Sequence, residues 1–325
     1  MSIQERCEYL YQVTPEGNAK LLAVRGYEPL IRLPESIEGH PLTALGEYGF
    51  SRLRDIPSDA VWTKTEDSDG MQLLCGNAVE EVWLPDTVAE IGALAFYDCR
   101  KLREVSMGAG LTSLGSDAFM NCRALERVDL RCGVDEPSGA KLILQQVRMQ
   151  MEIRFCLPDG SPEAALLYPE YTEGYQEIGP AHIFALQMEG EGFRARQCFR
   201  DRVVDLSAYD DVFPRIALEE KTIVAGKMAL LRLAWPAGLT EEHRLDYEVY
   251  VRAHGYALAC MQLEMRGLSM LQLLCELRLL APGELAEIIT AASRMEWAEG
   301  TAALMQWQKQ YYGGSTGKRY DLIEW

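Results

Sequence analysis

The run Gly-Gly-Ser-Thr-Gly-Lys-Arg at residues 313–319 has the composition of a loop that could hold a phosphate group. In such loops backbone amides surround the phosphate, a lysine reaches it, and the next residue supplies a hydroxyl for magnesium. Here Tyr312 occupies the place of the first required glycine, and Arg319 occupies the place of the hydroxyl. The sequence therefore predicts no nucleotide site in this run. A second glycine-rich run, at 108–115, lies inside a repeat that accounts for its glycines.

Groups for metal binding or nucleophilic catalysis are few and scattered. The four histidines show neither His-Glu-x-x-His spacing nor a cysteine at metal-ligand spacing. His243 and His254 fall in one predicted helix, where we interpret them as surface or capping groups. The chain has no Gly-x-Ser-x-Gly elbow and no Cys-His signature for a nucleophile. We expect no catalytic residue, no metal and no cofactor, although residues distant in sequence could still assemble a site in the fold.

Two consecutive segments of the chain, 79–101 and 102–124, are copies of one pattern. Seven positions agree at a constant offset of 23 residues, and a third copy begins at Leu125. One copy cannot bury its apolar side chains alone, so consecutive copies must stack into a solenoid. The repeated pairs are Val82/Val105, Val88/Leu111, Ile91/Leu114, Gly92/Gly115, Ala95/Ala118, Phe96/Phe119 and Cys99/Cys122.

Each copy predicts a short strand, with alternate side chains inward, followed by a turn. The turn brings one wide side chain and several small ones to the same axis. Phe96 and Phe119 should therefore stack in a ladder, each burying apolar surface worth about 2 kcal/mol. We interpret Gly92 and Gly115 as corners that need backbone angles available only to glycine.

These repeated positions resemble the BspA-like leucine-rich repeat family, whose lines read approximately IPxxVxxIGxxAFxxCxxLxxV. The likeness extends upstream into 31–50, although that coil has extra residues around Gly39 and no cysteine after its aromatic residue. The resemblance implies a curved solenoid over about 31–130 that is used for protein contact, and many family members are cell-surface proteins. The upstream matches are Leu33, Pro34, Leu45, Gly46, Gly49 and Phe50 with Leu84, Pro85, Ile91, Gly92, Ala95 and Phe96.

The segments around the repeat also predict β structure. Residues 7–33 predict two strands that cap the first coil, and 51–77 predict an inserted loop. After Leu130 the repeat stops, and strict alternation over 147–157 predicts one long half-buried strand whose apolar face closes the solenoid. A further strand is predicted at 182–188.

From about residue 200 the pattern becomes helical. Thr240 predicts the N-cap of a helix over 241–254, and four more helical runs follow, with breaks at Gly267 and Gly300. The helix pairs recur at roughly 27 to 30 residues and weakly resemble an ankyrin-like array, without its Thr-Pro-Leu-His signature. The tail from Gly313 predicts a loop.

The predicted fold is α+β in three parts. A BspA-like leucine-rich repeat domain with an N-terminal β cap occupies 1–138. It continues into a small β module or solenoid end at 139–200. A helical repeat-like domain of antiparallel helix pairs occupies 201–325.

Charge, cysteine content and apolar runs indicate which partners and which cellular compartment to expect. A formal net charge of -17 repels polyphosphates, so we expect no nucleic-acid partner. Nine scattered cysteines favour a reducing compartment, and Cys99 and Cys122 are interpreted as small buried residues, with a disulfide as the alternative. No apolar run of about 18 residues occurs, and the first residues lack the apolar core of a signal peptide. We expect a cytoplasmic protein without membrane insertion; the cell surface is the alternative that the family resemblance implies.

The outward side chains of successive strands should form columns of alternating charge. Trp83 stands out, because an exposed tryptophan on a solenoid sheet is a plausible contact anchor unless the insertion at 51–77 covers it. The candidate binding residues on this face are Glu81, Trp83, Arg103, Glu104, Ser106, Arg127 and Asp129.

We expect a non-catalytic adaptor or scaffold that binds a protein of unknown identity through this leucine-rich-repeat surface. The first alternative is an enzyme or small-molecule-binding protein with a pocket between the β and helical parts. The second is a structural spacer without a partner on the sheet face.

Overall fold

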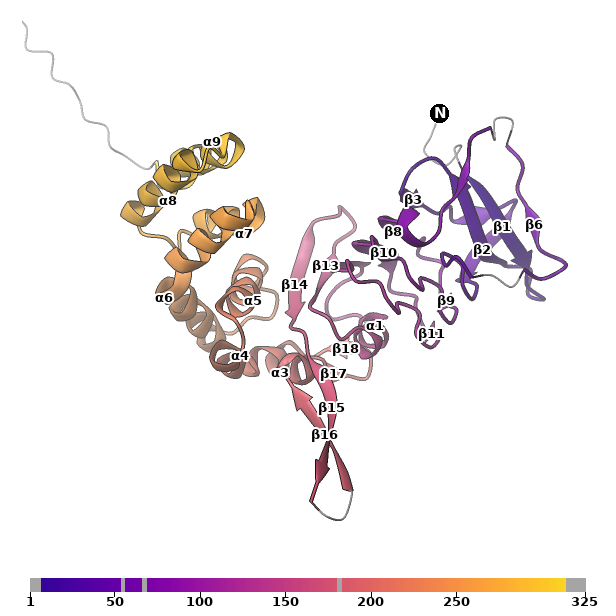
Figure 1. Ribbon diagram of the computed structural model, residues 1–325, viewed down its shortest axis with the longest axis horizontal. Coiled ribbons are helices and arrows are strands. Elements are labelled where there is room, and N and C mark those ends of the chain that lie inside the picture. Colours follow the sequence, from indigo (N-terminus) through magenta and orange to yellow (C-terminus); the bar gives the residue numbers. More distant parts are fainter. Residues whose placement is uncertain (1–6, 54–55, 66–68, 180–182, 314–325) are drawn as a thin grey trace, which may run out of the picture. The chain divides into compact units, whose positions relative to one another are not determined.

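The computed structural model describes residues 7–53, 56–65, 69–179 and 183–313 (Figure 1). The chain divides into two compact units, Met1–Val212 and Phe213–Trp325. The first unit holds the strands and the second is helical, which confirms the predicted α+β class with an N-terminal solenoid and C-terminal helices. The three-part division at 138 and 200 stays a prediction, and the predicted tail beyond 313 lies outside the described residues.

The solenoid is built on a six-stranded sheet with the order β14-β13-β12-β10-β8-β3. The five strands from β3 to β13 are parallel, as stacked coils require, and β14 is antiparallel at one edge. The strands are β3 (Leu30–Arg32), β8 (Glu81–Trp83), β10 (Glu104–Gly108), β12 (Arg127–Arg131), β13 (Met151–Cys156) and β14 (Pro162–Tyr168).

A second sheet follows the turn side of the coils, in the order β11-β9-β5-β2-β1-β6, with β4 beside β5 and β7 beside β2. Strands β1 and β2 form the predicted N-terminal cap as an antiparallel pair that continues this ladder. The predicted inserted loop contains β6 and β7, which pair with β1 and β2, and the short 3-10 helix η2 (Gly76–Ala78). The strands are β1 (Glu8–Val13), β2 (Ala19–Gly26), β4 (Ser36–Ile37), β5 (His40–Leu45), β6 (Val61–Trp62), β7 (Gln72–Leu73), β9 (Glu90–Ile91) and β11 (Ser113–Leu114).

The predicted aromatic ladder forms the centre of the solenoid. Phe96 and Phe119 stack with centroids 5.1 Å apart, and Phe50 stacks on the other side of Phe96 at the same spacing. All three rings are buried. The upstream coil at 31–50 therefore belongs to the solenoid, as its weaker match to the pattern predicts.

Gly92 and Gly115 mark the corners for a different reason from the predicted one. Neither has a positive φ; the left-handed backbone falls two residues later, at Leu94 and Asp117. A Cβ on Gly115 would lie 2.2 Å from the backbone nitrogen of Ala93 in the preceding coil. The glycines are required because the backbones of stacked coils approach too closely for a side chain.

The repeat geometry extends one coil beyond its predicted end. The strand predicted over 147–157 is shorter: β13 begins at Met151 and pairs in parallel with β12. Helix α1 (Ala140–Gln146) precedes it. The side-chain amide of Gln146 donates to the carbonyl of Gly115 at 2.7 Å, and its oxygen accepts from the amide of Ala118 at 3.0 Å. One side chain thus satisfies the backbone groups that another coil would bind, and the turn-side ladder ends.

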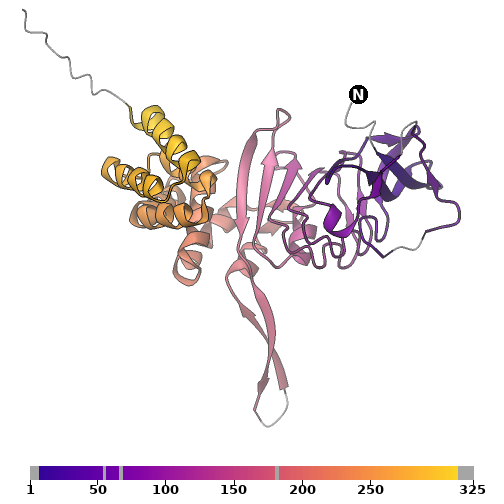
Figure 2. The same cartoon turned by 45° about the horizontal axis from the view of Figure 1, so that its top comes forward.

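The rest of the first unit follows β14. Strands β15 (Thr172–Ile178) and β16 (Ile183–Glu189) form a separate antiparallel hairpin that projects from the large sheet (Figure 2). Strand β16 is the one predicted at 182–188, apart from His182, which lies outside the described residues. The unit ends with α2 (Gly192–Ala195), the short pair β17 (Phe199–Arg200) and β18 (Val203–Val204), and α3 (Leu206–Asp211).

The second unit is all helical in its described part. Thr240 caps α6 as predicted, since its hydroxyl accepts from the amide of His243. The predicted break after 254 is wrong: α6 runs through Gly255, which lies buried against Leu280. The elements are α4 (Phe213–Glu219), α5 (Thr222–Ala234), α6 (Glu241–Met265), α7 (Leu268–Glu276), α8 (Pro282–Arg294), α9 (Ala298–Trp307) and the π-helix η3 (Gln308–Tyr312).

Candidate protein-binding face

The outward residues of β3, β8, β10, β12 and β13 form one surface, called the strand face below. Parallel register aligns them in columns, because equivalent positions of neighbouring strands lie side by side. One column runs from Leu30 to Glu152, and a second, two residues further along each strand, runs from Arg32 to Arg154. The first column is Leu30, Glu81, Glu104, Arg127 and Glu152; the second is Arg32, Trp83, Ser106, Asp129 and Arg154.

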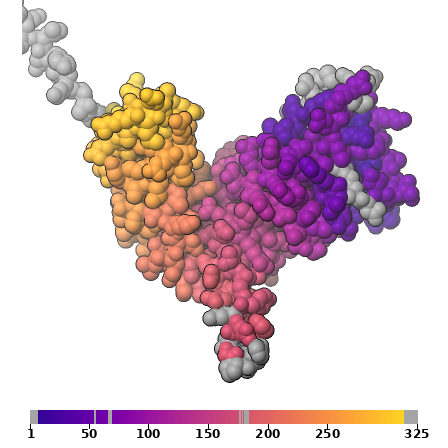
Figure 3. All heavy atoms as spheres, viewed as in Figure 1, coloured from indigo at the N-terminus to yellow at the C-terminus, as the bar shows by residue number. Residues whose placement is uncertain are grey.

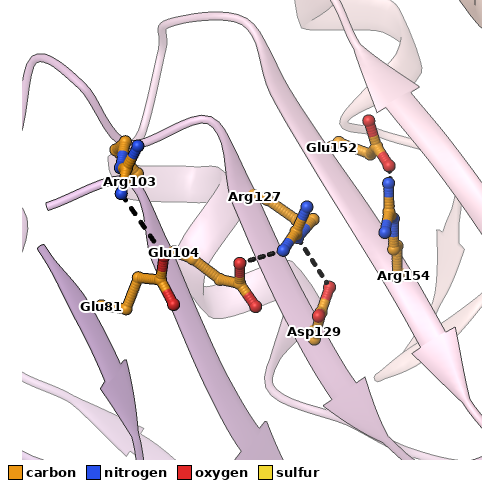
Figure 4. Close-up of polar contacts among 7 residues, drawn as sticks. All are labelled: Glu81, Arg103, Glu104, Arg127, Asp129, Glu152 and Arg154. Atoms are coloured by element: carbon orange, nitrogen blue, oxygen red, sulfur yellow. Dashed lines mark hydrogen bonds and ion pairs between the residues drawn. The ribbon is translucent and has the colours of Figure 1, made fainter. Parts of the chain in front are cut away.

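Ion pairs link neighbouring positions across the strand face (Figure 4). Arg103, just before β10, lies 3.3 Å from the carboxylate of Glu80 and 3.5 Å from that of Glu81. Arg127 on β12 pairs with Glu104 and lies 3.4 Å from Asp129. The charged residues therefore meet opposite charges within the sheet, as the alternating pattern predicts.

The carboxylates Glu104 and Glu152 are partly or fully shielded from water on this face. Partial burial raises the pKa of its carboxyl; the cation of Arg127 opposes that rise and Asp129 adds to it. Two strands away, on β13, Glu152 is buried and accepts a hydrogen bond from Arg154 at 2.5 Å. The open part of the face therefore lies toward β3, β8 and β10.

Trp83 is held between two guanidinium groups. The Arg32 side chain lies 4.4 Å from the ring centroid and Arg131 lies 4.2 Å from it. Arg131 also donates to Ser106 at 2.7 Å and pairs with Asp86 at 2.7 Å. Trp83 is half-buried rather than fully exposed. A cation–π contact with access to solvent contributes about 0.5–1 kcal/mol, so the two arginines together favour this orientation of the indole.

A shallow hollow of about 210 Å³ lies beside this tryptophan. Leu30 on the edge strand β3 is 48% exposed at its rim. None of the residues that line it comes from the described part of the 51–77 insertion, whose strands pair with the N-terminal cap instead. The lining residues are Glu28, Leu30, Ile31, Arg32, Glu81, Val82, Trp83, Glu104 and Ser106.

Four of the seven predicted residues border this hollow, and three lie further along the sheet. Glu81, Trp83, Glu104 and Ser106 line it. Arg103, Arg127 and Asp129 belong to the ion pairs beside it.

Sequence reasoning missed Leu30, Arg32 and Arg131. The match of Leu33 and Pro34 to Leu84 and Pro85, extended one residue back, would have placed Arg32 beside Trp83. Arg131 gave no such signal, since its neighbour in register is Gly108, which has no side chain.

The two buried thiols of the repeat, Cys99 and Cys122, offer little nucleophilic character. Burial raises the pKa of Cys99 to about 12 and raises that of Cys122 as well. All nine cysteines are free, so the alternative Cys99–Cys122 disulfide is not formed. Among the described residues, no three His, Cys, Asp or Glu side chains group as metal ligands would.

The family model described as BspA type leucine rich repeat region (6 copies) matches residues 70–138. This part of the chain is a BspA-type leucine-rich repeat region, and it includes β8, β10 and β12 of the strand face. The ankyrin-like resemblance concerns helices outside the match and stays a prediction. No curated protein matches the chain.

Similar solved structures include three leucine-rich repeat proteins. A leucine rich cell surface protein from Faecalibacterium prausnitzii A2-165 is 22% identical with a TM-score of 0.28, over 38% of this chain and 31% of that one. A leucine-rich repeat protein from Bacteroides capillosus ATCC 29799 is 25% identical with a TM-score of 0.27, over 37% and 76%. The T. pallidum Leucine Rich Repeat protein is 22% identical with a TM-score of 0.27, over 41% and 55%. The chain thus spans about a third of the first of these proteins.

The helices of the described residues are η2 and those from α1 to η3. None of them combines the length and the apolar composition that a span of the bilayer needs.

Proposed function

We propose that the chain is a non-catalytic adaptor or scaffold whose strand face binds a protein partner, with Trp83 as the central contact. The observation that carries this proposal is the indole held between Arg32 and Arg131 at the edge of an open hollow. Tryptophan and arginine are enriched among the residues that dominate binding energy at protein interfaces. The BspA-type repeat region supports the same role, because leucine-rich repeat proteins commonly provide binding surfaces.

Rigidity favours Trp83 as an anchor. A side chain whose orientation is already favoured by two neighbouring cations loses less conformational freedom when a partner covers it. Arg131 is fixed in turn by Ser106 and Asp86. The proposed face therefore has its principal contact in place before binding.

The chemistry of the hollow indicates the complementary group. Leu30, Ile31 and Val82 supply an apolar lining, with charged groups around them. An apolar side chain of the partner fits such a hollow, with polar groups of the partner at its rim. Arg32 is the cation among the lining residues, so a carboxylate of the partner at this rim would pair with it.

The test is a capture experiment with matched variants. Trp83→Ala and Arg103→Glu should each lose a protein that the wild-type chain retains from a cell extract. Met120→Ala is the control, because it removes an exposed apolar side chain outside the strand face. If both strand-face variants retain every partner that the control retains, the proposed face is wrong.

We also place the protein in the cytoplasm as part of this proposal. The support is nine free thiols, which suit a reducing compartment. Detection of the chain on the outside of intact cells by surface biotinylation would favour the alternative location at the cell surface.

A further inference from the structure

The hairpin β15–β16 carries apolar side chains that no function assigned so far requires. Figure 3 shows it standing out from the surface of the first unit. Tyr175 is 76% exposed, Phe184 62% and Leu186 51%. Large apolar side chains gathered on a projecting element commonly mark an interaction surface.

The register of the hairpin puts these side chains on one face. Tyr175 pairs with Leu186, Glu177 with Phe184, and Glu173 with Met188. Because side chains alternate across a strand, all six lie on the same side of the hairpin. The column on β16 is entirely apolar, whereas the column on β15 has a carboxylate on either side of its tyrosine.

Each strand of the hairpin also has an outer backbone edge. Among the described residues the hairpin is a separate two-stranded sheet, so each strand keeps one edge without a ladder partner. Such an edge is a template for pairing with another chain. An isolated two-stranded hairpin is only marginally stable in water, so an additional strand would stabilise it.

We propose that β16 pairs with β16 of a second copy of this chain, antiparallel and centred on Leu186. This register places Leu186 beside its own counterpart and Phe184 beside Met188 of the second copy. The two apolar columns then lie at the centre of a four-stranded sheet. Aromatic and aliphatic cross-strand neighbours of this kind stabilise antiparallel sheets.

Charge selects the β16 edge over the β15 edge. Pairing of two β15 strands about Tyr175 would place Glu173 opposite Glu177 of the second copy, which is unfavourable for like charges. The ion pair of Glu173 with Arg148 of its own chain, at 2.8 Å, offsets part of this repulsion. Pairing of β15 with β16 would leave free edges that continue to add chains, whereas β16 with β16 closes as a twofold dimer.

The expected affinity is modest. Seven residues from each copy pair in this arrangement, which is less than the 20–30 residues that each partner contributes to a standard interface. The net charge of -17 on each copy opposes association. We expect a micromolar dimer that tightens as salt screens this repulsion.

The first test measures the mass of the full chain by sedimentation from about 1 to 200 µM, a range that brackets micromolar affinity. Leu186→Lys puts two ammonium groups at the twofold axis and should weaken the dimer about tenfold or more, equal to about 1.4 kcal/mol. Tyr175→Lys is the matched control. It also replaces an exposed apolar side chain with lysine on the same face, but it lies on β15, away from the β16 edge. An equal loss in both variants, or a wild-type chain that stays monomeric, overturns the proposal.

The second test uses cross-linking. Directly opposed residues in an antiparallel pair have Cα atoms about 4.5–5.5 Å apart, which suits a disulfide. Leu186→Cys should form a covalent dimer under mild oxidation much faster than the wild-type chain with its nine cysteines. If Tyr175→Cys cross-links as fast as Leu186→Cys, the copies do not meet along β16.

Discussion

The thiol of Cys99 donates a hydrogen bond to the carbonyl oxygen of Phe50 in the preceding coil, at 3.3 Å. Cys122 repeats the contact with the carbonyl of Phe96, at 3.0 Å. The cysteine of this repeat therefore serves as a small buried donor that links one coil to the next. Water cannot reach the thiols to stabilise a thiolate, so each remains protonated in the folded chain.

This burial predicts a loss of stability at alkaline pH. The pKa of Cys99 rises from 9.0 to about 12 on folding, so its contribution is complete below pH 9 and is lost as pH rises toward 12. Between these values, the free energy of unfolding of the wild type should fall relative to Cys99→Ala by about 1.4 kcal/mol per pH unit. Urea titrations from pH 8 to 11 measure this difference.

The same substitution at Cys75 provides the control, because that thiol is only half-buried. Parallel pH profiles for the wild type and Cys99→Ala would show that the thiol ionises freely in the folded chain.

The aromatic ladder predicts a large effect of truncation. Phe96 is buried between Phe50 and Phe119, with interplanar angles of 7° and 4°. Phe96→Ala removes both contacts and leaves a cavity, and it should destabilise the first unit by about 3–5 kcal/mol. The midpoint of urea unfolding measures the loss. Met120→Ala, at an exposed position, should change stability by less than about 0.5 kcal/mol; a similar loss in both variants would contradict the ladder.

Close packing of the coils predicts that alanine is not tolerated at Gly115. Its Cβ would lie 2.2 Å from the nitrogen of Ala93, so two backbones must separate. We expect Gly115→Ala to cost about 2 kcal/mol or more, within the range for overpacked interiors. Gly174 offers the comparison, since a Cβ there meets nothing within 4 Å. Differential scanning calorimetry of both variants should show a lower melting temperature for Gly115→Ala alone.

The repeat pattern was enough to predict the columns of the strand face and the stack of Phe96 on Phe119, because both follow from a constant offset between copies. It was not enough for Arg131, which reaches across the sheet to lie over Trp83 although its neighbour in register is Gly108. Such contacts depend on how far a long side chain extends toward a neighbouring coil, and the spacing of residues in the sequence does not predict this.

The end of the solenoid shows the same limit. Alternation over 147–157 indicated a strand, and β13 occupies Met151–Cys156 within it. The spacing could not show that the side chain of Gln146 bonds the backbone groups of Gly115 and Ala118 at the end of the turn-side ladder. The binding role of the seven predicted residues on the strand face stays a prediction.

A buried arginine joins the segments that follow the last coil. Arg196 is 4% exposed and donates to the backbone carbonyls of Val147, Met149, Pro169 and Gly192. Desolvation lowers its pKa to about 10, and neighbouring tyrosines oppose that shift. The pKa stays well above neutral pH, so the guanidinium remains charged and its donors remain available.

Replacement of this arginine should destabilise the region from β13 to α3 strongly. Arg196→Lys keeps the charge but cannot donate in several fixed directions, so some carbonyls lose their partner. We expect a cost of about 3 kcal/mol, from buried hydrogen bonds to a charged group. Amide hydrogen exchange followed by mass spectrometry should show faster exchange in β13, β14 and α3. Arg194→Lys is the matched control, since its side chain is 54% exposed and pairs with Glu191 at 3.0 Å; equal exchange in both variants would mean that Arg196 does not hold these segments together.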